Sequence, residues 1–178
     1  MTGGHLFWIA SRASGTLALL LSSAAVAIGL MQGMRLVPRA NRDLRPLHEV
    51  LSLATMAAIA VHGVTLLGDG FLSPNVADLT IPFVSSYQRG WTTLGIVSGW
   101  ALIALGLSYY FRARIGVARW RRLHRFTALA WLAGLVHSLG EGTDAGQAWF
   151  LLAAAIAVAP ALALLLARPA NRLREGIS

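Results

Sequence analysis

Two apolar stretches of membrane length, each with a pair of histidines, constrain this chain more than any other feature. The stretches are residues 47–67 and 123–140, and they hold four of the five histidines. The four are, in chain order, His48, His62, His124 and His137. A buried imidazole costs free energy unless a partner satisfies it, so histidines within membrane spans indicate a functional site. Two pairs favour two shared ligands, and haem iron takes one histidine from each of two helices.

The composition predicts a polytopic membrane protein. Of the 178 residues, 56% are hydrophobic and 12% charged, and the mean hydropathy is +0.63. We expect an all-α membrane helical bundle formed by a single domain, residues 1–178, with five transmembrane helices. The spans are predicted at about residues 14–34, 47–67, 91–111, 123–140 and 147–167. The N-terminus lacks the basic region and cleavage site of a signal peptide, so the first span is expected to be retained.

Small residues recur at helical spacing in two of these spans. Gly15 and Gly29 are part of such a row in the first span, and Gly95 and Gly99 form one in the third. Rows of small residues let a neighbouring helix approach closely, so both spans are expected to make close helix contacts.

The arginines predict the orientation. The net charge of +8 comes from fifteen arginines without any lysine. Thirteen lie in the two loops and the tail on one side, and only Arg12 and Arg89 lie on the other. The positive-inside rule then predicts an external N-terminus and a cytoplasmic C-terminus in a prokaryotic plasma membrane. Membrane lipid is the expected surrounding. Nucleic acid is excluded, because the arginines flank apolar segments and no nucleic-acid-binding motif is present.

The predicted orientation places the histidines at two depths. The second and fourth spans run in the same direction, so His48 and His124 share the cytoplasmic depth and His62 and His137 the external one. Residues thirteen or fourteen apart on a helix are separated by about 20 Å, which is most of the hydrocarbon thickness. The chain has no cysteine, which excludes iron-sulfur clusters and covalently attached haem. Any haem must therefore be of b type.

The helical phase of the two pairs differs. Fourteen positions leave His48 and His62 about 40° apart, close to one face, but thirteen leave His124 and His137 about 140° apart. Two explanations stay open. The fourth span carries a local irregularity, such as a π-bulge near Gly134, or two haems approach it from different sides.

Haem propionates are anions and need donors. The candidates at the cytoplasmic end are Arg45, Arg119, Arg121, Arg122 and Arg125, although arginines there also serve orientation alone. Arg12 and Arg89 are candidates at the external end, for a haem or a substrate anion, because the topology requires no cation there.

These features together resemble the ferric reductase-like transmembrane domain, the haem core of NADPH oxidases, ferric reductases and the membrane subunit of the bacterial methionine sulfoxide reductase system. The resemblance rests on the histidine spacings, the basic RRLHR at 121–125 and SRASG at 11–15, and it covers about residues 11–167. It implies a helical bundle with two haem b groups as cofactors. The implied ligand pairs are His48 with His124 and His62 with His137.

The resemblance also sets expectations about partners. No G-x-G-x-x-G motif occurs in a soluble context, so we expect neither a flavin nor a nicotinamide domain in this chain. The electron donor is then a separate cytoplasmic flavoprotein, which would carry any flavin, or a quinol.

We therefore expect an electron-transfer subunit of an oxidoreductase, a dihaem b-type cytochrome. It would carry electrons from a cytoplasmic donor to ferric iron, oxygen or an exported redox partner outside. An inside-negative membrane favours this direction by about 2.3 kcal/mol per 100 mV. The alternatives are a quinol-linked cytochrome b, a metal or proton transporter, and a purely structural subunit. Transport pathways usually recruit carboxylates within the spans, which are scarce here.

Overall fold

The computed structural model describes residues 3–36 and 43–175, with side chains for 5–36 and 43–168. Arg39 and Arg42 of the first basic loop and the side chains of Arg172 and Arg174 lie outside it. Every regular element in these ranges is helical. The elements are α1 Gly3–Gly33, α2 Arg45–Leu67, α3 Val76–Thr80, α4 Arg89–Leu107, the 3-10 turn η1 Ser108–Phe111, α5 Arg112–Ile115, α6 Val117–His124, α7 Thr127–Gly140 and α8 Ala148–Glu175.

Four helical segments in the described residues are long and apolar enough to cross a membrane. They are His5–Gly33, Arg45–Leu67, Arg89–Ile115 and Ala148–Arg168. They correspond to the predicted first, second, third and fifth spans, so the prediction of an all-helical protein with several membrane-length helices is confirmed.

The predicted fourth span differs from these four. A turn at Arg125 and Phe126 separates α6 from α7, and α7 has only 14 residues. At 1.5 Å per residue α7 is about 21 Å long, short of a hydrocarbon core of about 30 Å. The five-span topology and the orientation of the termini therefore stay predictions.

This turn is the irregularity between His124 and His137. The Phe126 N–H donates to the Leu123 carbonyl at 2.9 Å, an i to i−3 bond of the 3-10 type. Each residue in 3-10 geometry rotates the chain by about 120° about the helix axis, instead of the roughly 100° of an α-helix. Two or three such residues therefore reduce the phase difference between the two histidines from about 140° to about 100° or less.

The suggestion of a π-bulge near Gly134 is wrong, because α7 is a continuous α-helix there. Gly134 instead allows close packing against α4. A Cβ at this position would lie 2.7 Å from the hydroxyl of Ser98, which itself donates to the Ala130 carbonyl at 2.8 Å.

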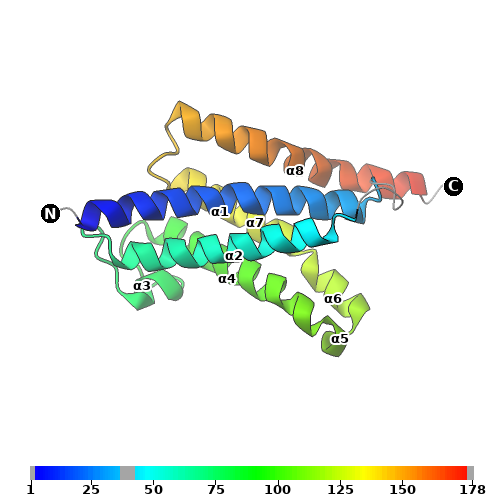
Figure 1. Cartoon of the computed structure of the whole chain (residues 1–178), viewed down its shortest axis with the longest axis horizontal. Coiled ribbons are helices and arrows are strands. Elements are labelled where there is room, and N and C mark those ends of the chain that lie inside the picture. The colour runs from blue at the N-terminus through cyan, green and yellow to red at the C-terminus, as the bar shows by residue number, and fades with distance from the viewer. Residues whose placement is uncertain (1–2, 37–42, 176–178) are drawn as a thin grey trace.

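The helices form a bundle around α1 (Figure 1). Helix α1 contacts α2, α7 and α8, and α4 contacts α7. Figure 1 shows α2 along one side of α1 and α8 along the other, with the short helices α5 and α6 at the end opposite α3.

Helix α1 begins earlier than predicted, at Gly3 instead of residue 14. The extra turns carry Arg12, whose guanidinium binds the carboxylate of Asp144 through two nitrogens and lies 4.1 Å from the ring of Trp8. This pairing neutralises the arginine within the extra turns of the helix.

The core is built around Trp131 of α7, which is 1% exposed. Its indole Nε1–H donates to the Ser23 hydroxyl of α1 at 3.0 Å, and Ser23 donates to the Leu19 carbonyl at 2.7 Å. Phe150 and Val158 of α8 belong to the same buried cluster. The tryptophan therefore joins the packing of α7 to both α1 and α8.

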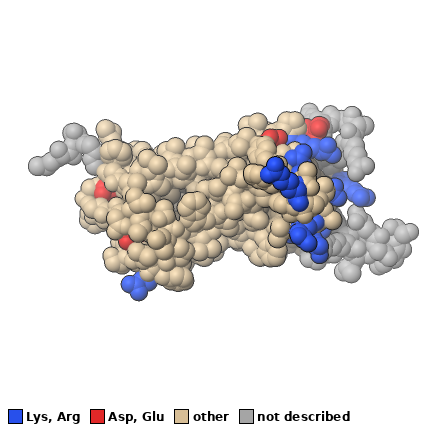
Figure 2. All heavy atoms as spheres, turned by 90° about the horizontal axis from the view of Figure 1, so that it is seen from below, with Lys and Arg blue, Asp and Glu red and all other residues tan. Residues whose placement is uncertain are grey.

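Most of the described basic side chains gather at one end of the molecule, and a single blue side chain is visible at the other end (Figure 2). The basic end is the one where α2 begins and where α5 and α6 lie (Figure 1). The asymmetry is the one that the sequence predicts for a cytoplasmic face.

Replacing Ser23 by alanine should destabilise the bundle by about 1–3 kcal/mol, because it leaves the buried indole N–H of Trp131 without an acceptor. The free energy of unfolding in detergent, from a denaturant titration, measures this. Ser14→Ala is the matched control, since Ser14 is also buried but donates to Ala10 within its own helix. Equal losses in the two variants would contradict the assignment.

Candidate functional site

Two cavities lie along the bundle, and each is lined by two of the four histidines. We call them the inner and outer cavity after the predicted orientation. His48 and His124 line the inner cavity, about 180 Å³, and His62 and His137 line the outer cavity, about 720 Å³. The outer volume lies within the usual range of ligand sites, about 300–1,000 Å³. Ser22 and Leu102 line both cavities, so only a thin layer of side chains separates them.

The inner histidines face each other across the inner cavity. The ring centres of His48 and His124 are 6.2 Å apart, and their planes are inclined by 82°. Two metal–nitrogen bonds of about 2 Å, with about 1 Å from each nitrogen to its ring centre, would span about 6 Å. The separation therefore fits one metal ion between the two rings.

Backbone carbonyls hold three of the four imidazoles. The Nδ1 atom of His48 lies 2.9 Å from the Ala25 carbonyl oxygen, and that of His62 lies 2.8 Å from the Ser11 carbonyl oxygen. The Nδ1 atom of His137 lies 2.9 Å from the carbonyl oxygen of Trp91. A carbonyl only accepts, so we assign the proton to Nδ1. Each Nε2 then keeps its lone pair, the state in which imidazole binds a metal.

A glycine follows each of these carbonyls by four residues. The carbonyl and glycine pairs are Ala25 with Gly29, Ser11 with Gly15, and Trp91 with Gly95. Residues i and i+4 lie on one face of a helix, so an imidazole that packs over the glycine also reaches the carbonyl one turn earlier. We call this arrangement the carbonyl–glycine cradle.

The cradle glycines leave room for the rings. A Cβ on Gly29 or on Gly15 would lie 3.1 Å from the imidazole of His48 or His62, and one on Gly95 would lie 2.6 Å from that of His137. The sequence prediction of close approach at these glycines is confirmed. It did not reveal that the approaching groups are the histidines.

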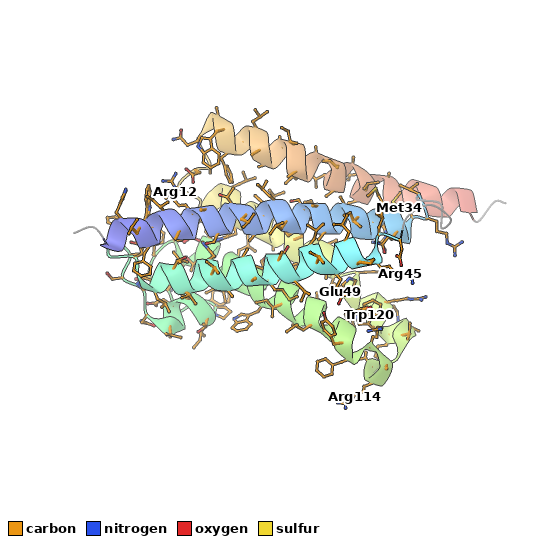
Figure 3. The ribbon with its side chains drawn as sticks, viewed as in Figure 1. Arg12, Met34, Arg45, Glu49, Arg114 and Trp120 are labelled. Atoms are coloured by element: carbon orange, nitrogen blue, oxygen red, sulfur yellow. The ribbon has the colours of Figure 1, made fainter. Side chains whose placement is uncertain are left out.

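His124 is held differently. The residue four positions after the neighbouring Leu105 carbonyl is Tyr109, not glycine, and the buried Nδ1 of His124 makes no hydrogen bond of normal geometry. Instead Trp120 stacks on the ring, with 5.0 Å between centres and 28° between planes. Ser108 accepts the Trp120 indole N–H at 3.1 Å and fixes this tryptophan on α6 (Figure 3).

A family model described as ferric reductase like transmembrane component matches residues 14–135, more than half of the chain. The chain belongs to this family. The matched segment includes three of the four histidines and ends two residues before His137. No curated protein and no solved structure matches the chain. Membership in the ferric reductase-like family indicates membrane electron transfer as the function.

The arginines around the inner cavity of this ferric reductase-like domain are in part those singled out in the sequence. Of the five candidates, Arg121 and Arg125 line the cavity. Arg45, Arg119 and Arg122 are exposed and lie outside the lining, and Figure 3 shows Arg45 near the start of α2. Arg168 also lines the cavity and was missed. Arg168 could have been found from the sequence because it is the first cationic residue after the last predicted span.

At the outer cavity, Arg12 is in the lining and Arg89 is not. Arg12 is paired with Asp144, which is 5% exposed, with 2.8 Å between Nε and Oδ2. Arg89 is exposed and reaches the Ser85 carbonyl at 3.4 Å. Sequence reasoning missed two carboxylates of the lining, Asp144 and Glu141, which come from the acidic loop after α7. Glu141 lies beside His137, with 3.1 Å between Oε2 and Nδ1.

Replacing Gly95 by alanine should lower the free energy of unfolding by about 1–3 kcal/mol, because the new methyl group would overlap the His137 ring. Gly63→Ala is the control. It changes a helical glycine beside His62, but a Cβ there would contact nothing within 4 Å. Denaturant titrations of both variants test this, and equal stability of the two would show that the cradle does not need its glycine.

Proposed function

We propose that this ferric reductase-like domain is a dihaem b-type cytochrome that carries electrons across the membrane. The observation that carries the proposal is the grouping of four histidines into two pairs, each pair at its own cavity. In three of the four, a backbone carbonyl occupies Nδ1 and leaves Nε2 for a metal.

The donor sets fit haem better than a bare metal ion. Among the described residues, no group of three or more histidine, aspartate or glutamate side chains is placed to hold a metal ion. Haem iron needs only two protein ligands when its ring supplies the other four, and two imidazoles on facing helices meet that need. The chain has no cysteine for covalent attachment, so the haems would be of b type.

His48 and His124 would hold the inner haem, and His62 and His137 the outer one. When bound, haem supplies one-electron chemistry between ferric and ferrous iron. The cradles keep three ligand rings in one tautomer and one orientation, while Trp120 supports the fourth. Around the inner cavity Arg121, Arg125 and Arg168 supply cations suited to propionates.

The proposed direction follows from charge. The arginine-rich end faces the cytoplasm by the positive-inside rule, so electrons enter at the inner pair and leave at the outer pair, down the membrane potential. The donor would be a separate cytoplasmic flavoprotein or a quinol. The acceptor would be ferric iron, oxygen or an exported redox protein. With two histidines holding each haem, the acceptor would take electrons without binding to the iron.

The first experiment is a haem count on the purified protein, by pyridine haemochrome and by a reduced-minus-oxidised spectrum. We expect two b haems per chain, and one after His62→Ala or His137→Ala, because each variant removes an axial ligand of the outer haem only. His5→Ala is the control, since His5 is exposed and stacks on Trp8, 5.5 Å between ring centres. A colourless protein would overturn the proposal, as would unchanged haem in both ligand variants.

A further inference from the structure

One of the four histidines has a carboxylate beside it. The Oε2 atom of Glu141, one turn after His137, lies 3.1 Å from the imidazole Nδ1. Both side chains are mostly buried, with 15% of Glu141 and 24% of His137 exposed. This carboxylate oxygen is buried and makes no hydrogen bond of normal geometry with a described residue, so it acts on the His137 imidazole through its charge at this short distance.

Helix α4 holds the carboxylate in this place. The Thr92 hydroxyl lies 2.7 Å from Oε1 of Glu141 and can donate to it, although the Tyr87 carbonyl, at 2.8 Å, is a second acceptor. The preceding residue, Trp91, supplies the carbonyl that accepts from His137. Adjacent residues of α4 therefore fix both acceptors around one imidazole N–H.

The other three histidines lack such an acceptor. At Nδ1, His48 meets a neutral carbonyl and His62 meets the carbonyl and the hydroxyl of Ser11, while His124 makes no hydrogen bond of normal geometry there. A negative charge beside the Nδ1–H stabilises positive charge on the ring more strongly than a neutral carbonyl does. A carboxylate behind a metal-bound histidine also makes the ring a more electron-donating ligand.

We propose that Glu141 is a positioning residue that lowers the reduction potential of the outer haem by placing a carboxylate charge beside the Nδ1–H of His137. The inference rests on the proposed function. A nearby anion and a more basic ligand both stabilise ferric iron, which carries one more positive charge than ferrous iron. The remaining charges at this cavity do not cancel the effect, because Arg12 is paired with Asp144. Asp69 and Asp78, which also line the cavity, add negative charge.

A lower potential at the outer site has a consequence for the acceptor. It makes the outer haem a stronger reductant, and so widens the set of acceptors to those that are hard to reduce. It also makes the electron transfer from the inner to the outer haem less favourable, which the membrane potential offsets.

The test is a redox titration of the haem-loaded protein with Glu141→Gln, which keeps the size and removes the charge. The wild type should titrate in two one-electron steps from ferric to ferrous. In the variant, the midpoint potential of one step should rise by about 59 mV. For a one-electron step this corresponds to an increase of about tenfold in the ratio of reduced to oxidised haem at a given potential. The other step should stay unchanged.

The chain offers a matched control in Glu49→Gln. Glu49 follows His48 in the sequence, but its carboxylate accepts from the Tyr110 hydroxyl at 2.9 Å, at the opposite end of the bundle from Arg12 (Figure 3). We expect both steps to keep their wild-type potentials. A similar shift in this control would overturn the inference, because any lost carboxylate would then suffice.

Two variants of Thr92 test the positioning without removing the carboxylate. Thr92→Val deletes the donor to Glu141 and should shift the same step in the same direction, whereas Thr92→Ser keeps the hydroxyl and should restore the wild-type value. The electron paramagnetic resonance signal of the outer ferric haem should change in Glu141→Gln and Thr92→Val only.

The haem count separates the two possible failures. Two haems with unmoved potentials in Glu141→Gln would overturn the role of Glu141 and leave the proposed function standing. Absence of haem from the wild type would overturn the proposed function itself. If Glu141→Gln loses the outer haem, the redox titration of Thr92→Val becomes the test. Unchanged potentials in Thr92→Val would then overturn the inference.

Discussion

The structure depends on the hydrogen bond between an imidazole Nδ1–H and a helix carbonyl. A helical carbonyl already accepts from the N–H four residues later, and its second lone pair is reachable only from the side. Glycine at that later position opens this side to the ring of a neighbouring helix. The same arrangement serves His48, His62 and His137, on two different helix pairs. It satisfies a buried polar ring, fixes its tautomer, and brings two helices into close contact at one place.

The sequence predicted the elements that depend on periodicity and length. Four membrane-length helices, and the grouping of His48 with His124 and of His62 with His137 at two cavities, follow from hydropathy and from counting along the spans. The ends of the helices were harder to predict from the sequence. The extra first turns of α1 carry an ion pair between Arg12 and Asp144, 132 positions apart, and the break after His124 occurs at residues that carry no glycine or proline signal.

The site was predicted only in part, because its finer contacts depend on rotation about helix axes. Arg121 and Arg122 are neighbours in the sequence, yet only Arg121 lines the inner cavity. One residue corresponds to about 100° of helical rotation, which a basic run without an apolar pattern does not define. Glu141 could have been found from its i, i+4 relation to His137. The Thr92 partner, 49 positions away, could not.

The cradle has a consequence for how such a protein tolerates change. A main-chain acceptor cannot be deleted by replacing a side chain. Any residue type at Ala25, Ser11 or Trp91 would therefore keep the carbonyl that accepts from the imidazole. The residue one turn later must be glycine, because a Cβ there would crowd the imidazole ring. The information that positions three imidazole rings thus lies in the absence of a side chain, on helices that do not carry these histidines. A ligand search confined to polar residues would pass over it.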